Sequence, residues 1–405
     1  MGRQSARLWH DGKDHKDIWK LIVDEKNAFN NAWRMHWQIY KGNRLLWEKL
    51  PPNFMAVCRK SHNDTDYYYG SDDGKRFTNY GFCIDYCNDA TGIRLRDFCK
   101  VGKYIFSIGY AAGICYTTNF YSWKTLDVKF NFFKGEDITH IENYNERLLI
   151  MTRYKILTYD IRNNEIKYIS INYHSGIDQF DFVNAETYAF GNTLLVKCRK
   201  TVKTTDVFGI PSSRKIEQLL VFKDDVLLKT FSEKLDEYGN TQAPFFYAKS
   251  LTGDGNTAYM IGSEGLFTGY GNRNGILSSK DGLTWKSEEN NYVAYEAISC
   301  TKKGLYAFYP DYGIEREYVI YKFENGSLKK IENRVNARAV KYDRAGTNKL
   351  LAFEAEGYMY ANAVVLVDGE EKLCFVRFKN FESEECEILS EMAFFEGIYV
   401  ENWED

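Results

Sequence analysis

Proline and long apolar runs are both scarce in this sequence. Proline occurs only 5 times in 405 residues. No stretch approaches the 18 or so apolar residues that suggest a membrane-spanning helix, and the charged start "MGRQSARLWHDGKDHKDIWK" lacks the apolar core of a secretory signal. We therefore expect no membrane insertion, and synthesis in the cytoplasm without a signal peptide.

Cysteine follows no recognisable disulfide or metal-binding pattern. The nine cysteines are an odd number, and no Cys-x-x-Cys pair occurs. Cys83, Cys87 and Cys99 lie close together in "CIDYCNDATGIRLRDFC", but the six histidines are scattered at spacings unlike those of zinc sites. Free, mostly buried thiols in a reducing cytoplasm explain the pattern best. We expect no metal ion and no cofactor.

An excess of charge of either sign is also missing. The chain has 53 Lys and Arg against 56 Asp and Glu, a formal net charge of −3, which argues against general capture of nucleic acid. Aromatic residues reach 16%, with 31 Tyr and 27 Phe, and these residue types favour strands. Helical periodicity is absent from residues 50–405, so we expect a β protein.

A short turn pattern recurs along the chain. It is clearest in "SSKDGLTW" (residues 278–285) and "SDDGKRF" (71–77), and looser in "TTNFYSW" (117–123). Four weaker turns follow strand-like runs in matching places. The Asp or Asn of each turn stands at position 73, 119, 163, 224, 281, 325 or 368, which makes seven units of 43 to 61 residues.

Within each unit, an apolar run precedes the turn, as in "ERLLIM", "NTLLVK" and "NTAYMIG". Most units also begin with a further short strand, so the order is strand, polar turn, buried strand, loop, strand, tight turn, strand. Four strands repeated seven times predict an all-β fold, a seven-bladed β-propeller of four-stranded antiparallel blades over residues 51–405. The first unit lacks its leading strand, and the C-terminal "EILSEMAFFEGIYV" is the candidate that completes it and closes the ring.

Residues 1–50 have a different character. "RMHWQIYKGNRLLWEKL" alternates aromatic and polar residues on both sides of a Gly-Asn turn, which predicts a hairpin. We expect a small β-rich N-terminal module there, either an attachment module or an ordinary subdomain packed on the first blade.

The turns resemble the Asp-box (BNR) repeat of bacterial sialidases, some sugar-active propellers and many phage proteins. In "SSKDGLTW", Asp281 can accept backbone N–H groups, Gly282 can take positive φ, and Trp285 can seal the blade. In that family such turns join the third and fourth strands at the periphery, so the resemblance implies a structural role. The residues concerned are Ser71, Asp73, Gly74, Phe77, Thr117, Asn119, Trp123, Ser279, Asp281, Gly282 and Trp285.

A second resemblance concerns "IYKGNRLLWEK", which is similar to a segment near the start of tail and baseplate proteins of phages and prophages from Gram-positive bacteria. It covers about a dozen residues. It implies a virion-associated component that is assembled inside the cell and released by lysis.

Recognisable catalytic motifs are absent from the sequence. The sialidase family carries one of its carboxylate-binding arginines in a Phe-Arg-Ile-Pro segment, whereas the nearest string here is "FGIP", with Gly209 in place of the Arg. No Gly-x-Ser-x-Gly, His-Glu-x-x-His, phosphate-binding glycine loop or EF-hand pattern occurs. We predict no catalytic residue and favour a binding protein over an enzyme. Because carboxylates are abundant, a glycoside hydrolase or lyase is the alternative.

The loops between second and third strands of propeller blades surround the centre of one face. Tyrosine faces stack on sugar rings, and Arg and Asp make directed hydrogen bonds, so a binding site is predicted there. We interpret the chain as a non-catalytic phage or prophage tail or surface protein that binds a bacterial cell-surface glycan, or else as a propeller scaffold for another tail protein. The predicted binding residues are Tyr110, Arg153, Tyr154, Tyr270, Arg273, Tyr309, Asp311, Tyr312 and Arg316.

Overall fold

The computed structural model shows a protein built from strands and turns. None of the described residues is helical, so no described segment could cross a membrane as a helix. The structure describes residues 6–8, 38–41, 44–49, 54–59, 67–71, 78–82, 95–109, 113–118, 124–126, 138–171, 180–205, 208–236, 241–242, 246–264, 275–289, 295, 297–310, 317–331, 337–341, 352–355, 357–382, 386–390 and 394–400.

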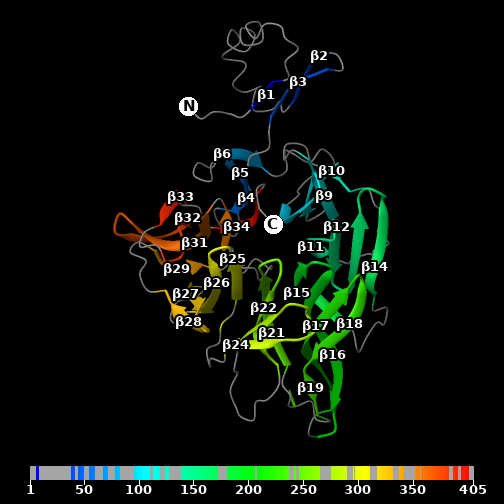
Figure 1. The fold of residues 1–405 in the computed structure, drawn as a ribbon. Helices are drawn as coiled ribbons and strands as arrows, with labels where there is room; N and C mark the ends of the chain where they lie inside the picture. Colours follow the sequence, from blue (N-terminus) through cyan, green and yellow to red (C-terminus); the bar gives the residue numbers. More distant parts are fainter. Residues whose placement is uncertain are drawn as a thin grey trace.

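The strands described between residues 54 and 400 form a propeller of six blades, which follow one another round a ring and are numbered here in chain order (Figure 1). Blade 1 contains β4 (Phe54–Arg59), β5 (Tyr67–Ser71), β6 (Thr78–Phe82) and β34 (Phe394–Val400). Blade 2 contains β7 (Leu95–Val101), β8 (Tyr104–Gly109), β9 (Gly113–Thr117) and β10 (Lys124–Thr125). Blade 3 contains β11 (Ile138–Tyr144), β12 (Arg147–Thr152), β13 (Lys155–Asp160) and β14 (Glu165–Ile171).

The remaining blades complete the ring. Blade 4 contains β15 (Phe180–Phe190), β16 (Thr193–Thr205), β17 (Pro211–Lys223) and β18 (Val226–Ser232). Blade 5 contains β21 (Phe246–Gly253), β22 (Ala258–Glu264), β23 (Gly275–Ser279) and β24 (Lys286–Glu289). Blade 6 contains β25 (Ala297–Thr301), β26 (Gly304–Pro310), β27 (Glu317–Glu324), β28 (Ser327–Lys330), β29 (Ala337–Lys341), β30 (Ala352–Ala355), β31 (Tyr358–Val367), β32 (Glu370–Phe378) and β33 (Glu387–Ser390).

The prediction of seven four-stranded blades is wrong. Blades 1 to 5 have four strands each, but the sixth and seventh sequence units share one nine-stranded sheet, so the described part of the ring has six blades. The strand that joins them is β29, which pairs with β27 through Tyr318 opposite Val340 and with β31 through Val340 opposite Ala363.

The reason for the joined sheet lies in the lengths of the strands. The partner β28 covers only the second half of β27, from Tyr321 to Glu324. The first residues of β27, Glu317 and Tyr318, therefore extend past the end of β28 and pair with β29 instead. Backbone N–H and C=O groups need hydrogen-bond partners wherever water is excluded. This pairing between two units supplies them, and no repeat pattern within one unit could have predicted it.

The start and the end of the propeller meet in blade 1. The last described strand, β34, pairs antiparallel with β4, so that Ile398 lies opposite Ala56 and Val400 opposite Phe54. Blade 1 thus takes one strand from residues 394–400 and three from residues 54–82. The contact links the two ends of the ring through main-chain hydrogen bonds.

Two smaller sheets lie outside the blades. β1 (Ala6–Leu8), β2 (Gln38–Lys41) and β3 (Arg44–Lys49) form a three-stranded sheet in which β3 is central. β19 (Lys234–Leu235) and β20 (Thr241–Gln242) form a short two-stranded sheet after blade 4.

The apolar runs seen in the sequence are buried on both faces of a blade. Along β12, Leu148 and Ile150 join a cluster with side chains of blade 2, while Leu149 and Met151 join a cluster with side chains of blade 4. Successive side chains of a strand point to opposite faces, so an unbroken run such as "LLIM" fits a sheet held between two neighbours. All four of these residues are fully buried.

The turn that contains Asp281 is held by its own side chains. The Asp281 carboxylate accepts the backbone N–H groups of Leu283 and Thr284, each at 2.8 Å, and the Ser279 hydroxyl accepts that of Gly282, also at 2.8 Å. Partial burial opposes ionisation of Asp281, but the N–H groups outweigh it and hold the pKa of the carboxyl below its ordinary value. The indole of Trp285 donates to the Gly282 carbonyl at 3.2 Å.

The same turn packs against blade 4. A Cβ placed on Gly282, whose φ is +73°, would lie 2.8 Å from a methyl group of Leu195 and 3.1 Å from one of Val221. Trp285 packs on the cluster shared by blades 4 and 5. Of the other residues in the predicted turn set, Ser71 and Thr117 end the strands β5 and β9. Asp73, Gly74, Phe77, Asn119 and Trp123 lie outside the described residues.

We expect Gly282→Ala to destabilise the protein far more than Gly326→Ala. Both glycines have positive φ, which costs alanine about 1 kcal/mol, but a Cβ at Gly326 meets nothing within 4 Å. At Gly282 the added methyl group also overpacks the contact with blade 4, which adds about 1–3 kcal/mol. Urea denaturation of the two variants measures the difference. Equal losses would show that the turn is not wedged between the blades.

Candidate functional site

Three of the nine predicted binding residues can be placed. Arg153 and Tyr154 form the turn between β12 and β13 in blade 3, and Tyr309 lies on β26 in blade 6. The structure therefore assigns them to two different blades. The other six lie outside the described residues: Tyr110, Tyr270, Arg273, Asp311, Tyr312 and Arg316.

The turn at Arg153 and Tyr154 has a fixed backbone. The buried hydroxyl of Thr152 accepts the N–H groups of Tyr154 at 3.3 Å and Lys155 at 3.1 Å, and the N–H of Phe182 in blade 4 donates to the Arg153 carbonyl at 2.9 Å. The exposed Arg153 guanidinium lies 5.2 Å from the centre of the Tyr154 ring. The turn thus presents a cation beside an aromatic ring, on a backbone held from both blades.

Tyr309 is engaged in packing between blades. Its ring meets that of Tyr295 edge to face at 6.5 Å, and Tyr295 is only 1% exposed. Tyr309 is itself half-buried against the cluster that contains Ile276 of blade 5 and Leu305 of blade 6. Its ring therefore contributes to the contact between blades 5 and 6.

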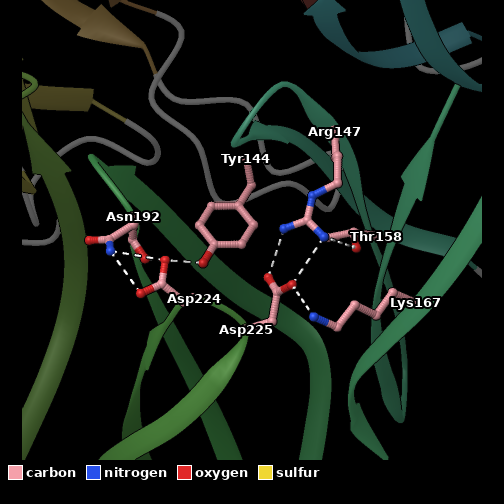
Figure 2. A network of polar contacts seen from close by, with 7 residues as sticks. All are labelled: Tyr144, Arg147, Thr158, Lys167, Asn192, Asp224 and Asp225. Atoms are coloured by element: carbon pink, nitrogen blue, oxygen red, sulfur yellow. Dashed lines mark hydrogen bonds and ion pairs between the residues drawn. The ribbon is translucent and has the colours of Figure 1, made fainter. Parts of the chain in front are cut away.

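A polar network between blades 3 and 4 was not predicted from the sequence. Asp225 lies in the turn between β17 and β18. Its carboxylate accepts hydrogen bonds from two guanidinium nitrogens of Arg147, at 2.9 and 3.0 Å, and from the ammonium of Lys167 at 2.7 Å (Figure 2). Arg147 also donates to Thr158 at 3.2 Å. The two cations come from β12 and β14 of blade 3. The bidentate ion pair of Arg147 and the contact of Lys167 therefore join neighbouring blades.

The preceding residue, Asp224, is bound within blade 4. Both of its carboxylate oxygens accept the side-chain amide of Asn192 at 2.9 Å, and its N–H donates to the Asn192 carbonyl at 3.1 Å. The same carbonyl accepts the buried hydroxyl of Tyr144 from blade 3 at 3.2 Å (Figure 2). Burial raises the pKa of the Tyr144 phenol, although hydrogen bonding with the Asp225 backbone lowers it in part.

These contacts hold an unfavourable backbone. Asp224 and Asp225 have φ values of 50° and 68°, the left-handed region that costs residues other than glycine on the order of 1 kcal/mol each. The comparable turns Asn325–Gly326 and Asp368–Gly369 place glycine second. Asp225 stands where those turns have glycine. Its ion pairs with blade 3 offset the cost of positive φ and keep the turn closed.

The network is suited to a structural role rather than to catalysis. Burial raises the pKa of Asp225, but the hydrogen bonds from Arg147 and Lys167 outweigh it, so the pKa lies below its ordinary value. The carboxyl is ionised at neutral pH and three donors occupy its oxygens. It therefore has no proton to give as a general acid.

His140, Thr187 and Glu142 form another polar group at the junction of blades 3 and 4. The Nε2 atom of His140 lies 2.8 Å from the Thr187 hydroxyl, which donates to Glu142, and the Glu142 carboxylate is 3.7 Å from the same Nε2 atom. In a catalytic triad the hydroxyl and the carboxylate lie at opposite nitrogens of the imidazole. This arrangement is different, and it ties β11 to β15. No cluster of His, Cys, Asp and Glu able to hold a metal ion occurs among the described residues.

Blade 4 carries a further feature that sequence reasoning missed. Five of the eight large apolar side chains that are exposed among the described residues belong to it. They are Phe208 and Ile210, at the end of the long β16–β17 hairpin, and Val226, Leu227 and Leu228 on β18. The repeat predicts a strand after the turn at Asp224, but no local pattern shows that Val226, Leu227 and Leu228 face solvent while Phe231 is buried.

We expect Asp225→Asn to lower the free energy of unfolding by about 1–3 kcal/mol at pH 7, because asparagine tolerates positive φ but loses the ion pairs with Arg147 and Lys167. Since the folded pKa of Asp225 is lowered, its contribution is complete above about pH 4 and disappears as the pH falls through the folded value. Urea denaturation of both proteins at pH 7 and pH 2.5 tests this. A difference that persists unchanged at pH 2.5 would assign the effect to the backbone.

No family model matches the chain, and no curated protein matches it. Among solved structures, the chain is similar to the WD40 β-propeller domain of Doa1, with 12% identity, a TM-score of 0.38, and coverage of 76% of this chain and 85% of that one. It is also similar to YCF48 bound to D1 peptide, with 9% identity, a TM-score of 0.39, and coverage of 75% and 86%.

A third similar structure is the acylaminoacyl peptidase of Pyrococcus horikoshii, with 12% identity and a TM-score of 0.42. That match covers 73% of this chain and 46% of the peptidase, so this chain spans less than half of its length. At such identities and scores, nothing about ligands or activity is transferred from these proteins. The propeller architecture itself rests on the strand pairings described above.

Proposed function

We propose that this chain is a non-catalytic recognition protein whose propeller binds a bacterial cell-surface glycan, as a component of a phage or prophage tail. A propeller is an architecture consistent with a binding or a scaffold role.

The observation that carries the ligand class is the turn at Arg153 and Tyr154. Sugar rings present apolar C–H faces that stack on aromatic rings, and hydroxyl and acidic groups that accept hydrogen bonds from a guanidinium. The turn offers an aromatic ring and a guanidinium, because the guanidinium of Arg153 lies 5.2 Å from the centre of the Tyr154 ring. Its backbone is held by Thr152 and by Phe182, so little conformational entropy is lost when a ligand binds.

The phage setting is supported by the sequence alone. The segment "IYKGNRLLWEK" resembles the start of phage tail proteins, and its described residues form the β2–β3 hairpin. Recognition without hydrolysis is the leading proposal, and a glycoside hydrolase or lyase is the alternative.

The Arg153→Ala/Tyr154→Ala double variant should lose binding to bacterial cell-wall polysaccharide by about tenfold or more, since stacking and charge-assisted hydrogen bonds each contribute roughly 1 kcal/mol. Glycan-array binding followed by titration calorimetry with the best glycan measures it. The matched control is Arg162→Ala/Tyr168→Ala, which removes an arginine and a tyrosine that are exposed elsewhere on blade 3.

Two outcomes would contradict the proposal. If the wild-type protein binds no glycan on the array, the ligand class is wrong. If the bound polysaccharide is recovered shortened, the protein is a glycoside hydrolase or lyase, and mass spectrometry of the recovered glycan detects this.

A further inference from the structure

The outer strand of blade 4 is apolar at its open edge. β18 is the last strand in the order β15-β16-β17-β18, and its only partner among the described strands is β17. Three consecutive residues at its start are largely in solvent: Val226 is 59% exposed, Leu227 44% and Leu228 49%. Edge strands with exposed apolar residues are templates for pairing with another strand, and natural proteins ordinarily protect them with charge.

Two other outer strands of the same propeller follow that ordinary rule. In blade 5 the last strand, β24, has the sequence Lys-Ser-Glu-Glu, and β28 in blade 6 reads Ser-Leu-Lys-Lys. An outer position therefore does not require an apolar surface in this protein. The run in β18 differs from these two strands, and its three apolar side chains are absent from the buried clusters that blade 4 shares with blades 3 and 5.

Of the four charged side chains that are exposed between residues 223 and 236, three are lysines and one is Asp224. Lys223, Lys229 and Lys234 are exposed along and beside the strand. Lys229 lies 4.0 Å from the ring of Phe231 and donates to the Leu283 carbonyl of blade 5. Two of the nearby acids are paired with cations, Asp225 with Arg147 and Lys167 of blade 3 and Glu233 with Arg214, whereas the partner of Asp224 is the neutral amide of Asn192.

We propose that the edge of β18 binds an extended segment of another protein, with apolar residues in its centre and acidic residues at its flanks, which adds to blade 4 as a fifth strand. Main-chain hydrogen bonds along the edge provide the attachment on either side of the irregularity at Leu228, where the register of β18 against β17 shifts, and the apolar centre covers Val226, Leu227 and Leu228. The acidic flanks match the lysines. This surface is separate from the Arg153–Tyr154 turn and does not depend on the glycan proposal.

A second copy of the chain is the rival occupant, and the charges disfavour it. Pairing β18 with its own copy would bring the lysines of one edge against those of the other, and like charges that face each other across strands are destabilising. An acidic partner gains the same interactions with the favourable sign.

The test uses the full-length protein and a fluorescent nine-residue peptide of five alternating valines and threonines with two glutamates at each end. Fluorescence anisotropy should show saturable binding that weakens at least tenfold in Val226→Ser/Leu228→Ser. Binding should also weaken in 0.5 M salt, because exposed charges are screened. Leu366→Ser is the control, because Leu366 on β31 is also 59% exposed and lies in blade 6.

The outcomes are distinct. A peptide with lysines in place of the glutamates should bind at least tenfold more weakly; equal binding would overturn the charge argument. Absence of binding by the acidic peptide, or an equal loss in Leu366→Ser, would overturn the proposed site. Dimers in analytical ultracentrifugation that are lost in Val226→Ser/Leu228→Ser would assign the edge to a second copy instead. Circular dichroism melting of each variant checks that the propeller is intact, and glycan binding by the Val226→Ser/Leu228→Ser variant should be unchanged.

Discussion

The structure depends on one constraint: each blade has two apolar faces, and both are buried only between two neighbours. β12 shows this directly, since Leu148 faces the cluster shared with blade 2 and Leu149 the cluster shared with blade 4. A row of such sheets would expose an apolar face at each end. A ring leaves none, and the pairing of β34 with β4 joins the two ends of this one. The unbroken apolar runs and the order of the strands in the described part of the chain fit that requirement.

Polar contacts then fix how neighbouring blades are positioned. The hydrophobic effect favours burial without specifying direction, whereas an ion pair such as Arg147 with Asp225 has a defined geometry. The turn around Asp281 does this with its own backbone and with Gly282 set against blade 4. The turn at Asp224 and Asp225, both at positive φ, does it with cations from blade 3 that bind Asp225, while Asn192 of blade 4 holds Asp224. Both turns occupy the connection between third and fourth strands, so equivalent positions in the repeat have acquired different means of attachment.

The two candidate binding surfaces, the Arg153–Tyr154 turn and the start of β18, consist of side chains that lie outside the buried clusters described between blades. Arg153 is exposed on a turn whose backbone is held by Thr152 and Phe182, and it has no part in the buried clusters. Val226, Leu227 and Leu228 of β18 are likewise absent from the buried clusters between blades 3, 4 and 5, whereas Tyr309, which was predicted to bind, is committed to the contact with Tyr295. The distinction matters because a side chain already buried between blades cannot also present its face to a ligand.

The sequence by itself determined the class of fold, the alternation of strands and turns, and the buried runs, because strand propensity, turn chemistry and period-two patterning are local properties. Hairpin turns lie at Asn163, Asp224, Asp281, Asn325 and Asp368, where the repeat predicted them, while positions 73 and 119 lie outside the described residues. Only the tertiary structure decided that the last two units merge through β29, that Asp225 is held by Arg147 across two blades, and that Val226 and Leu228 are exposed. Each of these depends on which segments distant in the chain become neighbours, and hydrogen bonds and burial between distant segments leave no periodic trace in the sequence.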